Sequence, residues 1–210
     1  MDSAAEVPRH EFDLSGGVLC LDFANTVSGR AAPADAVDHL QSFADVVSFA
    51  QQSKLISRAE ADGLQEEADA RPEAAKRVLR QAIALRESIF RVFAGLADDR
   101  PVRPRDIQRL QQAALDALGH RRLAPADGNY HWVWGAEEKK QLERILWPIA
   151  ESATDLLTSA DLRRVRQCEL ATCAWLFLDR SRNRSRRWCD MKVCGNREKA
   201  RRHYKRAHSS

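Results

Sequence analysis

The stretch CELATCAWLFLDRSRNRSRRWCDMKVC, residues 168–194, holds four of the five cysteines of this 210-residue chain. It contains two C-x4-C pairs separated by fifteen residues, formed by Cys168, Cys173, Cys189 and Cys194. Two close pairs at this separation are typical of a zinc site, in which each pair supplies two thiolates to one tetrahedral ion. We therefore predict that these four side chains bind one structural Zn²⁺.

Two disulfides or four unrelated core cysteines are the alternatives to zinc. The N-terminus lacks the apolar core of a signal peptide, and no apolar run approaches the roughly 18 residues that span a bilayer. This predicts a cytoplasmic protein without a membrane partner, and disulfides are disfavoured in that compartment. Four thiolate ligands leave no open coordination position, so the zinc is expected to be structural rather than catalytic.

The residues between and after the cysteine pairs predict a small finger. Trp175 and Phe177 alternate with Leu176 and Leu178, which favours a β-hairpin whose return strand carries Cys189. After Gly195 the chain consists of good helix formers, so the fourth ligand should lie at or just before a helix start. This order predicts a treble-clef-like finger.

Charge is distributed unevenly along the chain. Residues 161–210 contain 15 Lys and Arg against 5 Asp and Glu, whereas residues 1–160 contain 19 basic and 25 acidic residues. A basic segment on a mildly acidic body indicates a polyanionic partner, and nucleic acid is the obvious one. Like charges at i, i+4 destabilise an isolated helix, and phosphate would compensate them.

We accordingly predict DNA contact through the arginine-rich turn and the C-terminal helix. Asn196 and Arg197, at the helix start, are the candidates for reading base edges, although Asn196 could equally be a cap. A solvated basic tail and RNA binding are the alternatives. The predicted DNA-binding residues are Arg182, Arg184, Arg186, Arg187, Asn196, Arg197, Lys199, Arg201, Arg202, Lys205 and Arg206.

The rest of the chain predicts an α+β fold, a mainly α-helical N-terminal domain with small β-hairpins. Ser57 and Glu60 form a capping box, and a long apolar stripe follows Pro72. Expected helices cover about 33–54, 58–70, 72–97, 105–118 and 137–158, the last kinked at Pro148, and expected hairpins surround Gly16-Gly17 and Asp127-Gly128. Expected core side chains include Ile107, Leu110, Ala114, Leu118, Trp132, Trp134 and Trp147.

Three polar residues follow the first apolar segment: Asp22, Asn25 and Arg30. They could bind a small-molecule effector, but Asp and Asn also cap helix starts and turns. No Ser/His/Asp set, Gly-rich phosphate loop or paired-carboxylate motif stands out, so we expect no enzyme.

The tail LFLDRSRNRSRRWCDMKVCGNREKARRHYKR resembles the CGNR zinc-finger family through the tetrapeptide at residues 194–197. The N-terminal GGVLCLDFANTVSGR is similar to the opening of the ABATE domain, which precedes the finger in that family. The resemblance implies a bacterial, stress-responsive transcription regulator, with DNA binding by the finger and ligand sensing by the N-terminal domain. It predicts an ABATE-like domain at 1–160 and the finger at 161–210.

The hypothesis is thus a zinc-dependent DNA-binding transcription regulator, cytoplasmic and associated with the nucleoid when bound. The alternatives are an RNA-binding protein that uses the same basic surface, or a small-molecule-binding N-terminal domain with a purely structural finger. A homodimer is compatible with each.

Overall fold

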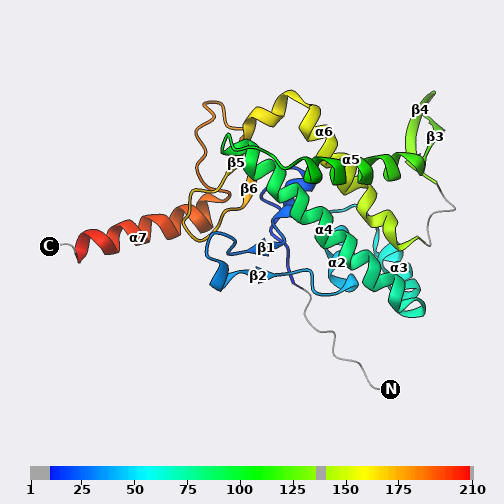
Figure 1. Ribbon diagram of the computed structural model, residues 1–210, viewed down its shortest axis with the longest axis horizontal. Helices are drawn as coiled ribbons and strands as arrows, with labels where there is room; N and C mark the ends of the chain where they lie inside the picture. The colour runs from blue at the N-terminus through cyan, green and yellow to red at the C-terminus, as the bar shows by residue number, and fades with distance from the viewer. Residues whose placement is uncertain (1–9, 136–140, 209–210) are drawn as a thin grey trace, which may run out of the picture.

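The computed structural model describes residues 10–135 and 141–208. Its described part is mainly helical with three antiparallel strand pairs, which confirms the predicted fold class (Figure 1). The helices are α1 (Leu19–Ala24), α2 (Phe43–Gln52), α3 (Arg58–Ala70), α4 (Pro72–Ala97), α5 (Pro104–Gly119), α6 (Trp147–Thr158) and α7 (Asn196–Ala207). Short 3-10 or π turns are η1 (Pro33–Asp35), η3 (Leu142–Leu146), η4 (Ala160–Arg164) and η5 (Met191–Gly195). The strand pairs are β1 (Val27–Ser28) with β2 (Val37–Asp38), β3 (Arg121–Ala126) with β4 (Asn129–Trp134), and β5 (Val165–Gln167) with β6 (Leu176–Leu178).

Helix α4 is the centre of the core, as its apolar stripe predicts. Ile89 and Phe93 are fully buried, whereas Leu96, at the end of the stripe, is 37% exposed. The helix contacts α1, α2, α3 and α5, and also β5 (Figure 1). The predicted helix α3 begins with the capping box, since Ser57 Oγ accepts from the N–H of Glu60 and the Glu60 carboxylate accepts from the N–H of Ser57.

The predicted hairpin around Gly16-Gly17 is wrong, because the apolar run after it forms helix α1. Cys20, Leu21 and Phe23 are all completely buried, and α1 packs between α4, α6 and β6. A short continuous apolar run has the same pattern in a buried strand and in a helix that is covered on most sides. Position 16 requires glycine, because the Cβ of any other residue there would lie 2.8 Å from Oδ1 of Asp22, which is too close for a carbon–oxygen contact.

The predicted helix over 33–54 begins too early. Pro33 starts only the short turn η1, and Val37 and Asp38 form β2, which pairs with β1. Helix α2 begins after Ser42, whose side chain accepts from the N–H of Asp45 in a capping box that sequence reasoning missed. The helical spacing of Val37 and Leu40 with the later apolar residues is therefore coincidental.

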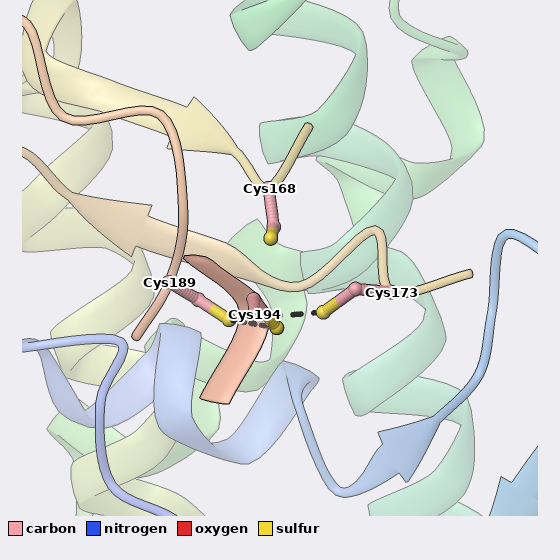
Figure 2. A group of neighbouring side chains, drawn as sticks. All are labelled: Cys168, Cys173, Cys189 and Cys194. Atoms are coloured by element: carbon pink, nitrogen blue, oxygen red, sulfur yellow. Dashed lines mark hydrogen bonds between the residues drawn. The ribbon is translucent and has the colours of Figure 1, made fainter. Parts of the chain in front are cut away.

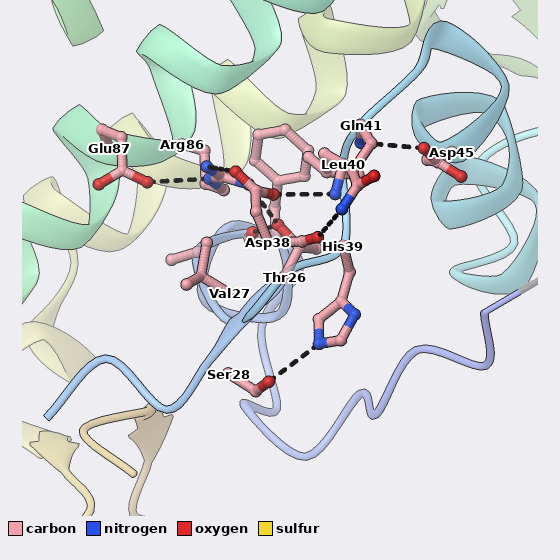
Figure 3. Close-up of polar contacts among 12 residues, drawn as sticks. Thr26, Val27, Ser28, Asp38, His39, Leu40, Gln41, Asp45, Arg86 and Glu87 are labelled. Carbon is pink, nitrogen blue, oxygen red and sulfur yellow. Dashed lines mark hydrogen bonds and ion pairs between the residues drawn. The ribbon is translucent and has the colours of Figure 1, made fainter. Parts of the chain in front are cut away.

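Strand β2 is held by an arginine that no sequence pattern indicates. Arg86 of α4 is 2% exposed and donates two hydrogen bonds to the Asp38 carboxylate, at 2.6 and 2.7 Å (Figure 3). Its Nε also donates to Glu87 at 3.0 Å. Burial raises the pKa of Asp38, but the hydrogen bonds and charge of Arg86 outweigh it and leave this pKa below its ordinary value.

The inward face of α5 differs from the prediction. Leu110 and Ala117 are buried, whereas Ile107 and Leu118 are exposed. The buried position near the helix start is occupied by Asp106, which accepts hydrogen bonds from Arg91 and so can be buried without loss of its charge. Gly119 lies in the last helical turn rather than beyond it, and His120 follows the helix.

The hairpin at Asp127-Gly128 is confirmed as β3–β4. Both turn residues have positive φ, 51° and 79°, as a type I′ turn requires. The hairpin projects from the helical body, so Trp132 is 55% exposed rather than part of the core (Figure 1).

Residues 137–140 of the last predicted helix of the N-terminal domain lie outside the described residues. The remainder divides into η3 and α6, and Pro148 stands in the first turn of α6, so it lies at a helix start and not in the middle of one long helix. Trp147 is buried at this start, as predicted.

Candidate metal centre and nucleic-acid interface

The four predicted cysteine ligands lie together at the base of α7. Their Sγ atoms are all within 4.8 Å of one another and converge on a common centre (Figure 2). The Sγ of Cys189 lies 3.7 Å from that of Cys173 and 3.5 Å from that of Cys194. A tetrahedral ion with Zn–S bonds of about 2.3 Å places its sulfurs about 3.8 Å apart. The donor set therefore fits one tetrahedral zinc.

Two backbone turns deliver these ligands. The N–H of Cys168 donates to the carbonyl of Trp175, and that of Cys173 to the carbonyl of Leu170, which closes the turn between β5 and β6. At the second pair, the Asp190 carboxylate accepts from the N–H of Val193 and starts the π turn η5, which carries Cys194.

The cysteines are close enough to determine each other's ionisation. Hydrogen bonds from Cys173 and Cys189 lower the pKa of Cys168 to about 2. Hydrogen bonding to Cys168 in turn raises the pKa of Cys173 and Cys189, and burial raises that of Cys194. Four thiolates this close together need a cation, and a bound divalent metal supplies the charge that deprotonates all four.

The hairpin predicted inside the finger is wrong, because its first strand, β6, pairs with a different strand from the one predicted. Strand β6 pairs with β5, upstream of the first cysteine, in the register Val165↔Leu178 to Gln167↔Leu176. Residues 179–188 form a loop and no return strand. Two ligands thus come from the β5–β6 turn and two from the segment that leads into α7, as in a treble-clef-like finger. Both pairs enclose a small core of Leu170, Phe177, Trp175 and Trp188.

The finger is continuous with the N-terminal domain. Val165, Leu176 and Leu178 belong to the same buried cluster as the helices α1 to α6. Trp175 Nε1 donates to the carbonyl of Val27 at 2.8 Å, and the N–H of Leu178 donates to the carbonyl of Gly16 at 2.8 Å. The predicted boundary between the N-terminal domain and the finger at residue 160 stays a prediction, because one apolar core extends across it.

The three residues proposed for effector binding make separate structural contacts. Asn25 bonds the backbone of Leu176, and Arg30 pairs with Glu87 at 2.7 Å. Asp22 Oδ1 accepts from the N–H of Gly16 at 2.7 Å. Burial raises the pKa of Asp22 to about 7, and the hydrogen bonds from Gly16 and Gly17 only partly offset this. Each side chain therefore has a structural role, that of Asn25 at the junction with the finger, and effector binding by these residues stays a prediction.

The basic residues of the finger divide into two groups. Several are engaged in the fold. Arg186 donates to the backbone carbonyls of Trp188 and Cys189 and covers the Phe177 ring at 4.4 Å. Arg187 Nε donates to Glu169 at 2.6 Å, and the amide of Asn196 donates to the carbonyl of Lys192 at 2.9 Å.

Arg201 and Arg202 share one carboxylate, that of Glu198, at 2.8 Å each. Their hydrogen bonds lower the pKa of Glu198 to about 2, so it stays ionised at neutral pH. Sequence reasoning missed this anion, although its i, i+3 and i, i+4 spacing from the two arginines was the available signal. It compensates part of the charge repulsion within α7.

The second group is exposed and unpaired. Helix α7 projects away from the body (Figure 1). Among the residues that the structure describes, the side chains of this group make no hydrogen bond or ion pair with the protein: Arg182, Arg184, Arg197, Lys199 and Arg206. Lys205 is also exposed on α7, where Tyr204 stacks on His208 at 4.0 Å.

Comparison with known families agrees with this geometry. The sequence model of the ABATE family, described as "Putative stress-induced transcription regulator", matches residues 17–160, and that of the CGNR zinc finger matches residues 164–207. Neither family is an enzyme family. A search of curated proteins gave no match. No helix in the described part of the chain is long and apolar enough to cross a bilayer.

These matches confirm the predicted metal centre: Cys168, Cys173, Cys189 and Cys194 are the site of one structural zinc ion. They also confirm the predicted order of the two units along the chain. The chain therefore belongs to the ABATE family and carries a CGNR zinc finger at its C-terminal end.

Proposed function

We propose that the protein is a zinc-dependent DNA-binding transcription regulator that responds to stress or to an effector, in the cytoplasm and on the nucleoid. The observation that carries this proposal is the exposed, unpaired set of cations on α7 and on the loop before Cys189. Such charges repel one another within the protein and are compensated by phosphate, whose counterions are released on binding.

The shape of α7 supports duplex DNA as the partner. Its 12 residues extend about 18 Å, and every residue from Lys199 to His208 is exposed. A helix of this kind fits the major groove, which is about 12 Å wide. The zinc site fixes the start of α7, so loss of the metal should release the helix from the body and abolish binding.

Arg197 and Asn196 have different environments in this arrangement. The amide of Asn196 already donates to the carbonyl of Lys192, which supports a structural role for its NH₂ group and leaves its oxygen as an acceptor. Arg197 has no partner among the described residues and is the better candidate for a base contact. The remaining cations of the unpaired group would hold phosphates.

The test uses the full-length, zinc-loaded chain, because the finger shares its core with the N-terminal domain. Affinity for genomic duplex fragments is measured against salt concentration by fluorescence anisotropy. Each phosphate contact contributes about 0.9 to the slope of log K against log salt. Arg182→Gln with Arg184→Gln should therefore reduce this slope by up to about two.

Arg58→Gln with Arg105→Gln is the matched control, since both arginines are exposed on α3 and α5 and the same charge is removed. An equal slope change in both double variants would show that only net charge matters and would reject the finger as the contact surface. Tighter binding of RNA than of duplex DNA at matched salt would select the RNA-binding alternative instead.

A further inference from the structure

A cavity of about 660 Å³ lies between α4, α5, η3 and the start of α6. In Figure 1 these elements meet at the end of the molecule opposite α7. Its floor is apolar and consists of Leu85, Leu146, Trp147 and Ala150, all of them buried, with half-buried Ala113 beside them. The volume lies within the range of small-molecule sites, roughly 300–1,000 Å³.

One wall of this cavity is aromatic and flat. The His120 ring stacks on the indole of Trp147, with ring centroids 4.0 Å apart and planes within 10°. Trp134 of the β3–β4 hairpin packs against the same indole at 5.4 Å. Because His120 covers one face of the indole and Trp147 is buried, a planar aromatic ligand would stack on the other face of the half-buried His120 ring, which lines the cavity.

The rim of the cavity is cationic. Arg77 pairs with Glu143 at 2.9 Å, and Asp116 accepts a hydrogen bond from the neutral amide of Gln112 at 2.8 Å, so the lining holds three arginines against two carboxylates. Arg80 and Arg109, from α4 and α5, make no hydrogen bond or ion pair with another residue in the described part of the chain. The rim therefore offers two guanidinium groups for an anion, and guanidinium binds carboxylate and sulfonate groups through paired hydrogen bonds.

We propose that this cavity is a binding site for an aromatic organic anion, whose rings stack on the His120 ring and whose carboxylate or sulfonate binds Arg80 and Arg109. The site is distinct from the basic surface of the finger and from Asp22, Asn25 and Arg30. Helix α4 forms one wall of the cavity and also contacts β5, so it connects the site physically to the finger.

The test titrates the zinc-loaded full-length protein with anilinonaphthalene sulfonate, an aromatic anion that fluoresces in apolar surroundings. N-phenylnaphthylamine, the same ring system without the sulfonate, is the neutral comparison. Arg80→Gln with Arg109→Gln should weaken sulfonate binding by about tenfold or more, because hydrogen bonds to charged groups are lost. Binding of the neutral dye should be nearly unchanged.

Arg58→Gln with Arg105→Gln is the matched control, because it removes the same charge from two exposed arginines that do not line the cavity. A second variant, Ala113→Trp, fills the cavity and should abolish saturable binding of both dyes, with folding checked by circular dichroism. Wild-type sulfonate affinity in the Arg80→Gln, Arg109→Gln variant, wild-type affinity in a folded Ala113→Trp protein, or an equal loss in the Arg58→Gln, Arg105→Gln control would each overturn the proposal.

Discussion

The side chain of Asn25 bonds both backbone polar groups of Leu176. Its Nδ2 donates to the carbonyl oxygen at 2.8 Å and its Oδ1 accepts from the N–H at 2.9 Å. Leu176 is in β6, so Asn25 acts as a one-residue neighbouring strand on the edge not paired with β5. These bonds, 151 residues apart in the sequence and buried, join the ABATE domain to the finger.

Asn25→Ala should destabilise the protein by about 2–4 kcal/mol, because two buried backbone groups lose their partners. The free energy of unfolding is measured by urea denaturation of the zinc-loaded protein. Asn129→Ala is the control, since Asn129 is exposed next to the hairpin turn and its loss should cost no more than about 0.5 kcal/mol. Equal effects from the two substitutions would contradict the structural role of Asn25.

Cys189→Ser should leave the protein without its full equivalent of zinc. Cys189 is 1% exposed and lies between Cys173 and Cys194, so its loss removes a ligand from the centre of the cluster. A structural zinc contributes on the order of 10 kcal/mol in small fingers, so we expect the whole protein to unfold thermally at a lower temperature. Metal content is measured by mass spectrometry on protein purified without chelator.

Cys20→Ala is the control for this experiment. Cys20 is fully buried in α1, and burial raises its pKa to about 12, so its thiol is neutral and binds no metal. The Cys20→Ala protein should retain one zinc per chain even if its stability falls. Full zinc content in Cys189→Ser would refute the four-cysteine centre.

Features set by local chemistry were predictable. The α4 stripe, the Ser57–Glu60 capping box and the Asp127-Gly128 turn each depend on residues within a few positions of one another, and all three are confirmed. The zinc ligands were predictable because thiolate chemistry restricts the usable spacings.

Features that depend on partners distant in the sequence were not predictable. The partner of β6, the helical state of the run in α1 and the buried Arg86–Asp38 pair are decided by contacts between segments that no local pattern specifies.

Asp22 gives the junction a pH dependence with a defined sign. Burial raises its pKa from the ordinary 3.8 to about 7, so the folded state holds the proton more tightly than the unfolded state. The resulting stabilisation is fully present below the pKa that Asp22 has in the unfolded state. It is lost as the pH rises through the pKa that Asp22 has in the folded state, by up to about 4 kcal/mol. Asp22→Asn keeps an oxygen for the N–H of Gly16 and removes the titration.

We therefore expect the stability of the Asp22→Asn protein relative to the wild type to rise by about 1 kcal/mol between pH 6 and pH 8, the last part of the change, where the cysteines keep their metal. The measurement is urea denaturation at several pH values. Asp127→Asn, at the exposed hairpin turn, should follow the wild type at every pH. A stability difference between Asp22→Asn and the wild type that does not vary with pH would contradict a raised pKa.

Glu198→Gln should increase affinity for DNA. The Glu198 carboxylate, in the first turn of α7, holds Arg201 and Arg202, and its negative charge lies among the cations that we propose bind phosphate. The substitution removes that negative charge and frees two guanidinium groups, so the slope of log K against log salt should steepen by up to about two. Zinc content is measured in parallel to show that the start of α7 is intact.

Glu66→Gln is the matched control. It removes an exposed carboxylate from α3, changes net charge equally and should leave the salt slope unchanged. If both variants shift affinity by the same factor, the effect comes from net charge, and Glu198 does not restrain the basic surface of the finger.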